Sequence, residues 1–253
     1  MHLIDTHCHL DFTQFDHDRD RVLQHCLELG VKDIVVPAVT AERWPTAVSI
    51  FQSSAMLHLA LGLHPMFMQQ HQAKHIDELR NMVSIHHPIA IGEIGLDFYL
   101  NDHDKQRQIE LFTAQLTIAE EVHLPVLLHI RKAHDHAISL LKQHTLSGGI
   151  VHAFNGSIQQ AKQYQQLGFV FGIGGAITNP NATRLRQLIS KLPLDSLVLE
   201  TDAPDMSLFN HNEERNSPEN IPKILASLAD IRSETYQELA MATYNNSRRV
   251  LKL

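Results

Sequence analysis

Two histidines separated by one residue stand at the end of a short apolar segment near the start of the chain. His7 and His9 flank Cys8. On an extended strand, alternate side chains point to the same side, so the two imidazoles share one face and Cys8 lies on the other. Two imidazoles on one face can bind a divalent metal. In a chain with 19 histidines, the pair alone fits two ordinary histidines about as well, and Cys8 is expected to pack as an apolar residue.

Further histidines and carboxylates stand at the ends of other strand-like segments. In a parallel barrel the carboxyl ends of all strands meet at one rim, so these side chains are expected to converge. They combine imidazole and carboxylate ligands without a thiolate, a set that suits zinc, manganese or a similar divalent ion. Because the set is too large for one tetrahedral site, we expect two metals that share a bridging carboxylate. The residues at these ends are His7, His9, His64, Glu93, His129, His152, Glu200 and Asp202.

Short apolar segments alternate along the chain with longer stretches whose apolar residues recur at a helical period. This alternation within 253 residues matches a closed (β/α)₈ TIM barrel, so we predict an α/β fold with one barrel domain over 1–253. An open doubly wound sheet is the alternative, but Gly172 to Gly175 lack the spacing of a dinucleotide-binding loop, and tight packing explains these glycines more simply than phosphate binding. The predicted strands are Leu3–Thr6, Asp33–Ala38, Leu57–Leu61, Ile89–Gly92, Val126–Leu128, Ile150–His152, Phe169–Ile173 and Leu197–Glu200. The predicted helices include Asp18–Leu29, Lys105–Val122, Ser157–Leu167, Thr183–Leu192, one that Ser217 caps and that runs to Ile231, and Glu234–Leu251.

The composition limits the kinds of protein that this chain can be. With 43% apolar and 19% charged residues it has an ordinary globular composition. It has no apolar stretch of the roughly 20 residues that a membrane span needs, no secretory signal and only two cysteines, so we expect a cytosolic protein without a disulfide framework. A net charge of -7 argues against broad wrapping of nucleic acid, but it is compatible with an enzyme that contacts few phosphates.

Four segments resemble the signatures of the TatD-type metal-dependent deoxyribonucleases, a family within the amidohydrolase-like barrels. The first is Leu3–Asp11, with the histidine pair, and the others follow at intervals along the whole chain: Gly92–Asp97, Pro125–Asp135 and Leu199–Pro204. The resemblance implies a TIM-type barrel and a metal-dependent hydrolase and, more specifically, a nuclease. It also implies which residues bind metal: His7, His9 and Asp202 one ion, His129 and His152 the other, with Glu93 as the bridge.

Other residues near the predicted rim have expected roles in catalysis or substrate binding. Asp202 is the candidate to orient or deprotonate the attacking water, and Glu93, as the bridge, is the second catalytic candidate. Glu200 either supports a ligand from behind or forms a structural ion pair. His64 either contacts a substrate phosphate or caps its strand. Arg131, two residues after His129, suits phosphate recognition, and Arg215 lies in a segment that resembles a family loop bordering the substrate.

We therefore predict a hydrolase that uses two divalent ions (zinc, manganese or magnesium) to cleave DNA phosphodiester bonds, from strand ends. The alternative substrate is an ester, lactone or amide of a small molecule, because metals that polarise a phosphoryl oxygen also polarise a carbonyl oxygen. A third hypothesis is a barrel without catalytic activity that binds metal or a partner protein. We expect a monomer with DNA ends or a small phosphodiester or ester as its substrate, and no membrane association.

Overall fold

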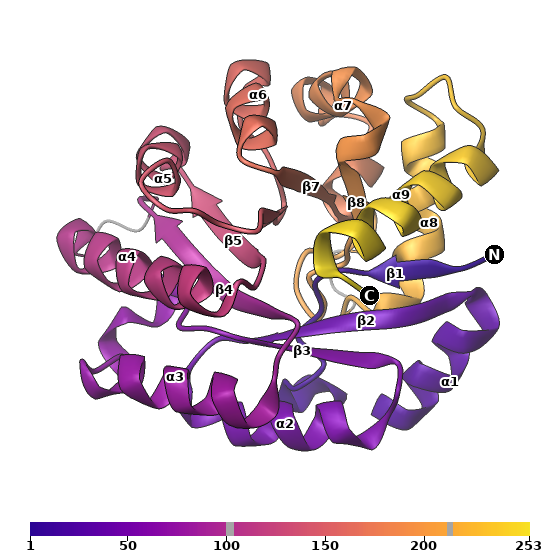
Figure 1. The fold of residues 1–253 in the computed structure, drawn as a ribbon. Coiled ribbons are helices and arrows are strands. Elements are labelled where there is room, and N and C mark those ends of the chain that lie inside the picture. Colours follow the sequence, from indigo (N-terminus) through magenta and orange to yellow (C-terminus); the bar gives the residue numbers. More distant parts are fainter. Residues whose placement is uncertain (100–103, 212–214) are drawn as a thin grey trace.

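The computed structural model describes residues 1–99, 104–211 and 215–253. Within these residues, eight parallel strands follow one another around a barrel in the order of the sequence, and helices cover its outside (Figure 1). The predicted (β/α)₈ fold is confirmed. The strands are β1 (Leu3–Asp5), β2 (Val31–Ala38), β3 (Leu57–Leu61), β4 (Ala90–Asp97), β5 (Val126–Arg131), β6 (Gly149–Val151), β7 (Phe169–Ile173) and β8 (Leu197–Leu199). The helices are α1 (Arg19–Leu29), α2 (Trp44–Ser53), α3 (Lys74–His86), α4 (Lys105–Val122), α5 (His134–Leu141), α6 (Ile158–Gln166), α7 (Thr183–Lys191), α8 (Ile221–Ala229) and α9 (Tyr236–Leu251).

Backbone hydrogen bonds join the first and last strands, and the segments that follow them, at the seam of the barrel. The Thr6 N–H donates to the Leu199 carbonyl over 2.9 Å. Beyond the strands, the Asp202 N–H donates to the His7 carbonyl over 2.8 Å, and the His9 N–H donates to the Ala203 carbonyl over 2.7 Å. These bonds hold the segment with the two histidines beside the segment with Asp202, although the two lie at opposite ends of the chain.

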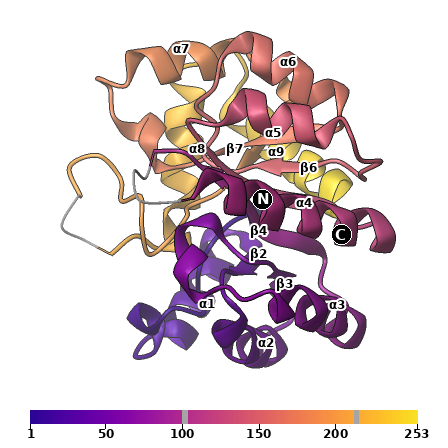
Figure 2. The ribbon, with the colours of Figure 1, turned by 90° about the vertical axis from the view of Figure 1, so that its left-hand side faces the viewer.

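Small aliphatic side chains fill the inside of the barrel, as expected for a barrel of this size. Val250 and Leu251, the last two residues of α9, pack against them and plug one end of the barrel. The larger apolar core lies between the strands and the surrounding helices, with α1–α3 along one side and α5–α7 along the opposite side (Figure 2). The interior residues, one from each strand from β2 to β8, are Val35, Ala60, Ala90, Leu127, Ile150, Val170 and Val198.

Several helices begin and end where their sequences supply a cap. Ser157 and Gln160 form a reciprocal capping box at the start of α6, and Thr235 and Glu238 do the same for α9. Gly30 ends α1 in the left-handed conformation, with φ of 89°, that favours glycine. In the described parts of the chain no helix is both long and apolar enough to cross a membrane.

Strand β4 is longer than the sequence predicted, and this changes the position of Glu93. We expected the strand to end at Gly92, but it continues to Asp97, because its residues remain buried throughout. Its pairing with β5 shifts register between Ile91 and Ile94, as in a β-bulge. Bulges re-aim side chains and are common beside active sites. Glu93 therefore reaches the centre from within a strand and not from the end of one.

Two smaller predictions also need adjustment. β5 runs to Arg131 and not only to Leu128, which places His129 and Arg131 on the same face of one strand. Ser217 occupies the predicted N-cap position but makes no side-chain capping bond, because its hydroxyl donates to Glu219 instead. A 3₁₀ turn therefore precedes α8, and α8 ends two residues earlier than expected.

Candidate metal centre

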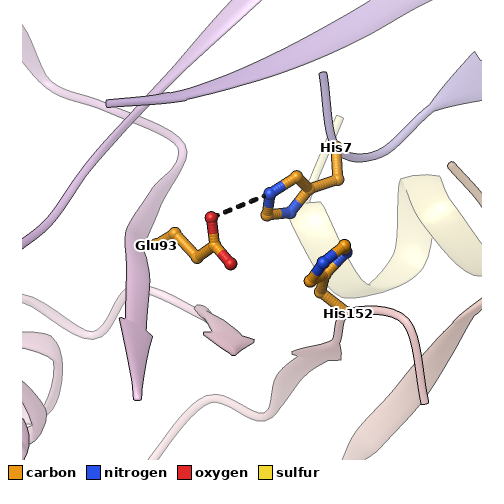
Figure 3. Close-up of side chains that lie close together, drawn as sticks. All are labelled: His7, Glu93 and His152. Atoms are coloured by element: carbon orange, nitrogen blue, oxygen red, sulfur yellow. Dashed lines mark hydrogen bonds and ion pairs between the residues drawn. The ribbon is translucent and has the colours of Figure 1, made fainter. Parts of the chain in front are cut away.

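The predicted ligands gather at the carboxyl ends of strands from around the barrel. Their side chains are mostly buried, and Figure 3 shows Glu93 pointing at His7 while the His152 ring lies beside the His7 ring. The two rings stack with centroids 4.1 Å apart. His7 and His9 follow β1, Glu93 lies in β4, His129 in β5, His152 follows β6 and Asp202 follows β8.

Glu93 lies between two groups of histidines, and each of its carboxylate oxygens faces a different group. Oε2 is 3.0 Å from Nε2 of His7 and 3.5 Å from Nε2 of His9. Oε1 is 3.1 Å from Nε2 of His64 and 3.2 Å from Nδ1 of His129. A carboxylate that offers one oxygen to each of two donor groups has the arrangement of a bridging ligand.

The donor atoms around the first group have the spacing that a divalent ion requires. Besides the Glu93 contacts, Asp202 Oδ1 lies 3.6 Å from His7 Nε2 and 3.4 Å from His9 Nε2. Ligands about 2.1 Å from a tetrahedral metal are separated from one another by about 3.4 Å. The four distances between the two imidazole nitrogens and the two carboxylate oxygens, 3.0 to 3.6 Å, are thus close to the edge length of such a tetrahedron. The residues present fit a zinc-like ion at this position.

Hydrogen bonds on the outer side of the rings fix which nitrogen faces the centre. His9 Nδ1 lies 3.1 Å from the Pro37 carbonyl oxygen, so it carries a proton and Nε2 is the nitrogen that faces Asp202 and can exchange its proton for a metal. His129 Nε2 lies 3.2 Å from Asp97 Oδ2, which leaves Nδ1 toward Glu93. Partners of this kind orient metal-binding histidines and raise their basicity. Both rings are therefore set up to bind a cation.

Glu200 supports the His152 side of the centre from a fully buried position. Its Oε1 lies 2.9 Å from His152 Nδ1 and accepts a hydrogen bond from the Ala153 N–H over 2.7 Å. His152 Nε2 then faces Asp202, with 3.5 Å between Nε2 and Oδ2. A Cβ on Gly172 would overlap the Glu200 carboxylate, so the glycine is required by packing, as the sequence suggested.

His64 differs from the other histidines of the centre in its hydrogen bonding. Its Nδ1 accepts a hydrogen bond from the Met66 N–H over 3.0 Å, and burial lowers the pKa of His64 to about 4. The neutral ring must therefore carry its proton on Nε2, the nitrogen that faces Glu93. Although His64 lies as close to Glu93 as His129 does, it is a hydrogen-bond donor there and not a metal ligand.

Negative charge dominates the centre. Burial works against ionisation of Glu93, but the neighbouring His64 and His7 hold its pKa well below the usual value. Burial also opposes the charge on Asp202, and His152 outweighs it to lower the pKa of Asp202 to about 2. Both carboxylates are therefore ionised at neutral pH although they are shielded from water. Such groups need positive charge close by.

This negative charge raises the pKa values of His9 and His152. Burial alone would lower their pKa values, but the hydrogen bond to Asp202 together with Glu93 raises the pKa of His9 to about 9. Glu200 and Asp202 raise that of His152 to about 10. A centre that holds protons on buried imidazoles is one in which a divalent cation can replace those protons.

Comparison with known proteins agrees with this geometry. The family model described as TatD related DNase matches residues 4–252. The chain belongs to this family. The "Uncharacterized metal-dependent hydrolase YjjV" of Escherichia coli K12 is 42% identical, over 96% of this chain and 95% of the relative. A protein of Erwinia tasmaniensis named "3'-5' ssDNA/RNA exonuclease TatD" is 34% identical, over 99% of this chain and 100% of the relative.

Solved structures of TatD proteins share the fold. The crystal structure of the TatD homologue YjjV from Escherichia coli K12 matches with a TM-score of 0.96 and 40% identity, over 99% of this chain and 98% of that chain. A TatD family hydrolase from Entamoeba histolytica matches with a TM-score of 0.85 and 24% identity, over 99% and 98% of the two chains. The protein is thus similar to metal-dependent hydrolases of the TatD family along its whole length.

The positions of the histidines can be compared with the ligand sets that the family resemblance implies. His7, His9 and Asp202 lie together as one group. His129 groups with His64 and Glu93, and His152 groups with His7 and Glu93, while the ring centroids of His129 and His152 are 6.2 Å apart. Glu93 is close to both, so the assignment of His129 and His152 to a second metal stays a prediction.

The two arginines predicted to contact substrate occupy different surroundings. Arg131 lines a cavity of about 410 Å³ that also borders His129, His152 and Asp202. Arg215 instead makes two bonds to Asp18, of 2.7 and 2.8 Å, and a third to the carbonyl of Gln14. Because these contacts occupy the Arg215 guanidinium, we do not include Arg215 in the proposed substrate site.

Two buried aspartates near the centre were not singled out in the sequence. Asp97 orients His129, as described above. Asp5 accepts hydrogen bonds from the backbone N–H groups of His7 and Thr201 and from the Thr201 hydroxyl, and so ties the two metal-binding segments together. Burial raises the pKa of Asp5 to about 8. The signal that could have found them is their position inside the family-like segments, at even spacing from His7 and Glu93.

Proposed function

We propose that the protein is a two-metal phosphodiesterase that removes nucleotides from the ends of single-stranded DNA, with zinc, manganese or magnesium as its ions. The observation that carries the proposal is the placement of Glu93, whose Oε2 faces His7 and His9 and whose Oε1 faces His129, beside a cavity. Membership of the TatD family and the nuclease name of the Erwinia tasmaniensis relative support it. A monomeric state and a cytosolic location stay predictions.

Bound divalent ions would activate a water molecule near neutral pH and neutralise charge on the phosphoryl oxygens. Asp202 is the residue that we expect to accept a hydrogen bond from this water. Its Oδ1 faces His7 and His9, its Oδ2 faces His152, and the side chain is still 16% exposed toward the cavity. Because its pKa is about 2, Asp202 is ionised at neutral pH, and its carboxylate can accept a hydrogen bond from the water and orient it.

One side chain at the edge of the cavity is suited to hold the scissile phosphate. Arg131 presents its guanidinium there, whereas the protonated Nε2 of His64 already donates to Oε1 of Glu93 over 3.1 Å. A guanidinium matches the geometry of two phosphate oxygens. Its N–H donors would fix the phosphodiester with its bond in line for attack, while Glu200 keeps the His152 ring in place.

The alternative substrate, a small ester, lactone or amide, has one observation in its favour. Much of the cavity wall away from the ligands is aliphatic, with Ile173, Ile177 and Ile189 among its residues. Metal analysis of the purified protein, followed by assays with each defined ion on single-stranded DNA and on a panel of esters and amides, decides between them. Turnover of the panel without turnover of DNA would overturn the proposal, and no turnover at full metal loading would favour a barrel without catalytic activity.

The role of Asp202 gives a direct prediction. Asp202→Asn removes the charged acceptor of this hydrogen bond but keeps the shape of the side chain, so we expect kcat on single-stranded DNA to fall by about 100-fold or more, with a smaller change in substrate binding. The control is Asp205→Asn, which removes the same charge from an exposed carboxylate three residues away. Equal losses of turnover and binding in Asp202→Asn would contradict this role.

A further inference from the structure

The cavity over the metal centre continues outward along the barrel rim. A second hollow of about 540 Å³ shares Arg131 and Asn155 with it, and a third of about 370 Å³ shares Asn155, Gly156 and Arg184 with the second. Each is of the size that holds a small organic ligand. Together they form a continuous groove that leads away from the predicted ligands, over the ends of β5 and β6 and the start of α7.

The groove is positively charged, although the chain as a whole has a net charge of -7. Arg131, Lys132 and Arg184 line the second hollow, all three are exposed, and no Asp or Glu lines it among the described residues. Within those residues none of the three cations lies within 4.0 Å of a carboxylate oxygen. Unpaired cations gathered on an acidic protein focus a field that attracts anions.

An exposed aromatic ring lies among these cations. The Tyr99 side chain is 52% exposed, and the Arg131 guanidinium lies 3.8 Å from the centre of its ring. The Lys132 ammonium lies 5.8 Å from the same ring. Arg131 therefore lies over the face of the Tyr99 ring in a cation–π contact. Such surfaces are where proteins stack the unpaired bases of single-stranded nucleic acid.

Asn155 borders all three hollows and is oriented by buried groups behind it. His134 Nδ1 lies 3.2 Å from the Tyr164 hydroxyl, and His134 Nε2 lies 3.3 Å from Asn155 Oδ1. Because the hydroxyl donates to Nδ1, the neutral ring donates from Nε2 to Oδ1. Burial lowers the pKa of His134 and keeps it neutral. The Asn155 amide nitrogen is left to donate into the groove.

We propose that this groove is a track for single-stranded nucleic acid, in which Arg131, Lys132, Arg184 and Asn155 bind phosphates next to the scissile one and Tyr99 stacks a base. The inference rests on the proposed phosphodiesterase function and deepens it. Its consequence is that the enzyme discriminates in favour of a strand of several nucleotides over an isolated phosphodiester.

Arg184 is the residue with which to test the track, because it lies on α7, outside the predicted metal centre. Arg184→Gln should weaken binding of a phosphorothioate oligothymidylate, followed by fluorescence anisotropy, on the order of 5-fold to 10-fold, and should lower the slope of log Kd against log salt by about 0.7. The matched control is Lys191→Gln. It removes the same charge from an exposed position on the same helix that borders none of the three hollows.

The activity arm compares kcat/KM for an oligothymidylate with that for bis(p-nitrophenyl) phosphate in the metal-loaded enzyme. If the groove is such a track, Arg184→Gln should lower kcat/KM for the oligothymidylate more than kcat/KM for the small diester. Lys191→Gln should change the two values equally. Equal behaviour of the two variants, or a duplex bound as tightly as the single strand, would overturn the inference. If the unmodified enzyme cleaves neither substrate, the proposed function fails, while the anisotropy comparison still tests the track.

Discussion

At the scale of single residues, the nitrogen that each histidine leaves unprotonated determines what it can do in the centre. His9 and His129 donate hydrogen bonds from their outer nitrogens to the Pro37 carbonyl and to Asp97, so their other nitrogens face the centre. His64 does the reverse, because the Met66 N–H occupies its Nδ1. Three histidines that look alike in the sequence therefore divide into two bases and one donor, and the neighbours that divide them are mostly backbone groups.

Asp97 gives a test of this orientation. Asp97→Asn removes the charge that holds the proton on His129 Nε2, while an amide oxygen can still accept the Tyr99 N–H. Loss of such a partner costs about 10-fold to 100-fold in metal affinity, so we expect weaker binding of one ion in a metal titration. The matched control is Asp33→Asn, which breaks another histidine–aspartate pair, that with His58, away from the centre. Equal metal affinity in both variants would contradict the orientation.

At the scale of elements, strand ends and one bulge bring the ligands together. His7 and Asp202 follow their strands, as the sequence predicted, and His152 follows β6 directly, where the sequence predicted it as the last residue of the strand. Glu93 comes from a register shift inside β4, between Ile91 and Ile94, beyond the point where the sequence predicted the strand to end. β7 and β8 then pack so closely that Gly172 leaves just enough room for the Glu200 carboxylate.

Glycine at 172 can be tested against its neighbour at 174. A Cβ at Gly172 would overlap Glu200, whereas the nearest atom to a Cβ at Gly174 is 3.5 Å away. We expect Gly172→Ala to destabilise the protein by about 1–3 kcal/mol and to reduce activity, because a displaced Glu200 no longer holds His152. Gly174→Ala should have a far smaller effect on both. Urea unfolding and DNA hydrolysis measure them, and equal effects of the two substitutions would rule out this packing role.

What could be predicted from the sequence follows from the same contacts. The alternation of apolar and amphipathic segments was enough to predict the barrel. The residues at the ends of the predicted strands were enough to propose the metal ligands. Asp5 and Asp97 were missed because their partners, Thr201 and His129, lie on other strands and become neighbours only after folding. The contact between Tyr99 and Arg131 was missed for the same reason.

At the scale of the whole molecule, the centre links distant parts of the chain. Its predicted ligands lie within β4 and β5 and shortly after β1, β6 and β8, so bound ions would tie both ends of the sequence to the middle. Without ions, the negative charge of Glu93 and Asp202 has to be balanced by protons on His9 and His152. The stability of the barrel should therefore depend on metal and on pH together.

The sign of this dependence can be worked out from the pKa values. In the metal-free protein, His9 and His152 have pKa values of about 9 and 10, above the ordinary value of 6.5. The stability that their protons contribute is complete below pH 6.5 and is lost as the pH rises toward 10. Metal binding has the opposite dependence on pH, because the metal must displace these protons. For each proton released, the metal affinity rises about tenfold with each unit of increase in pH.

We therefore expect the difference in Tm between the metal-loaded and the chelated protein to grow from pH 6 to pH 9. An ion at 100 times its Kd adds about 2.7 kcal/mol, which is about 5–10 °C for a chain of this length. Differential scanning calorimetry with and without chelator measures it. His9→Gln should reduce the difference, whereas His58→Gln, at a histidine outside the centre, should leave it intact. A difference that stays constant or shrinks with rising pH would show that these histidines do not bind the ions.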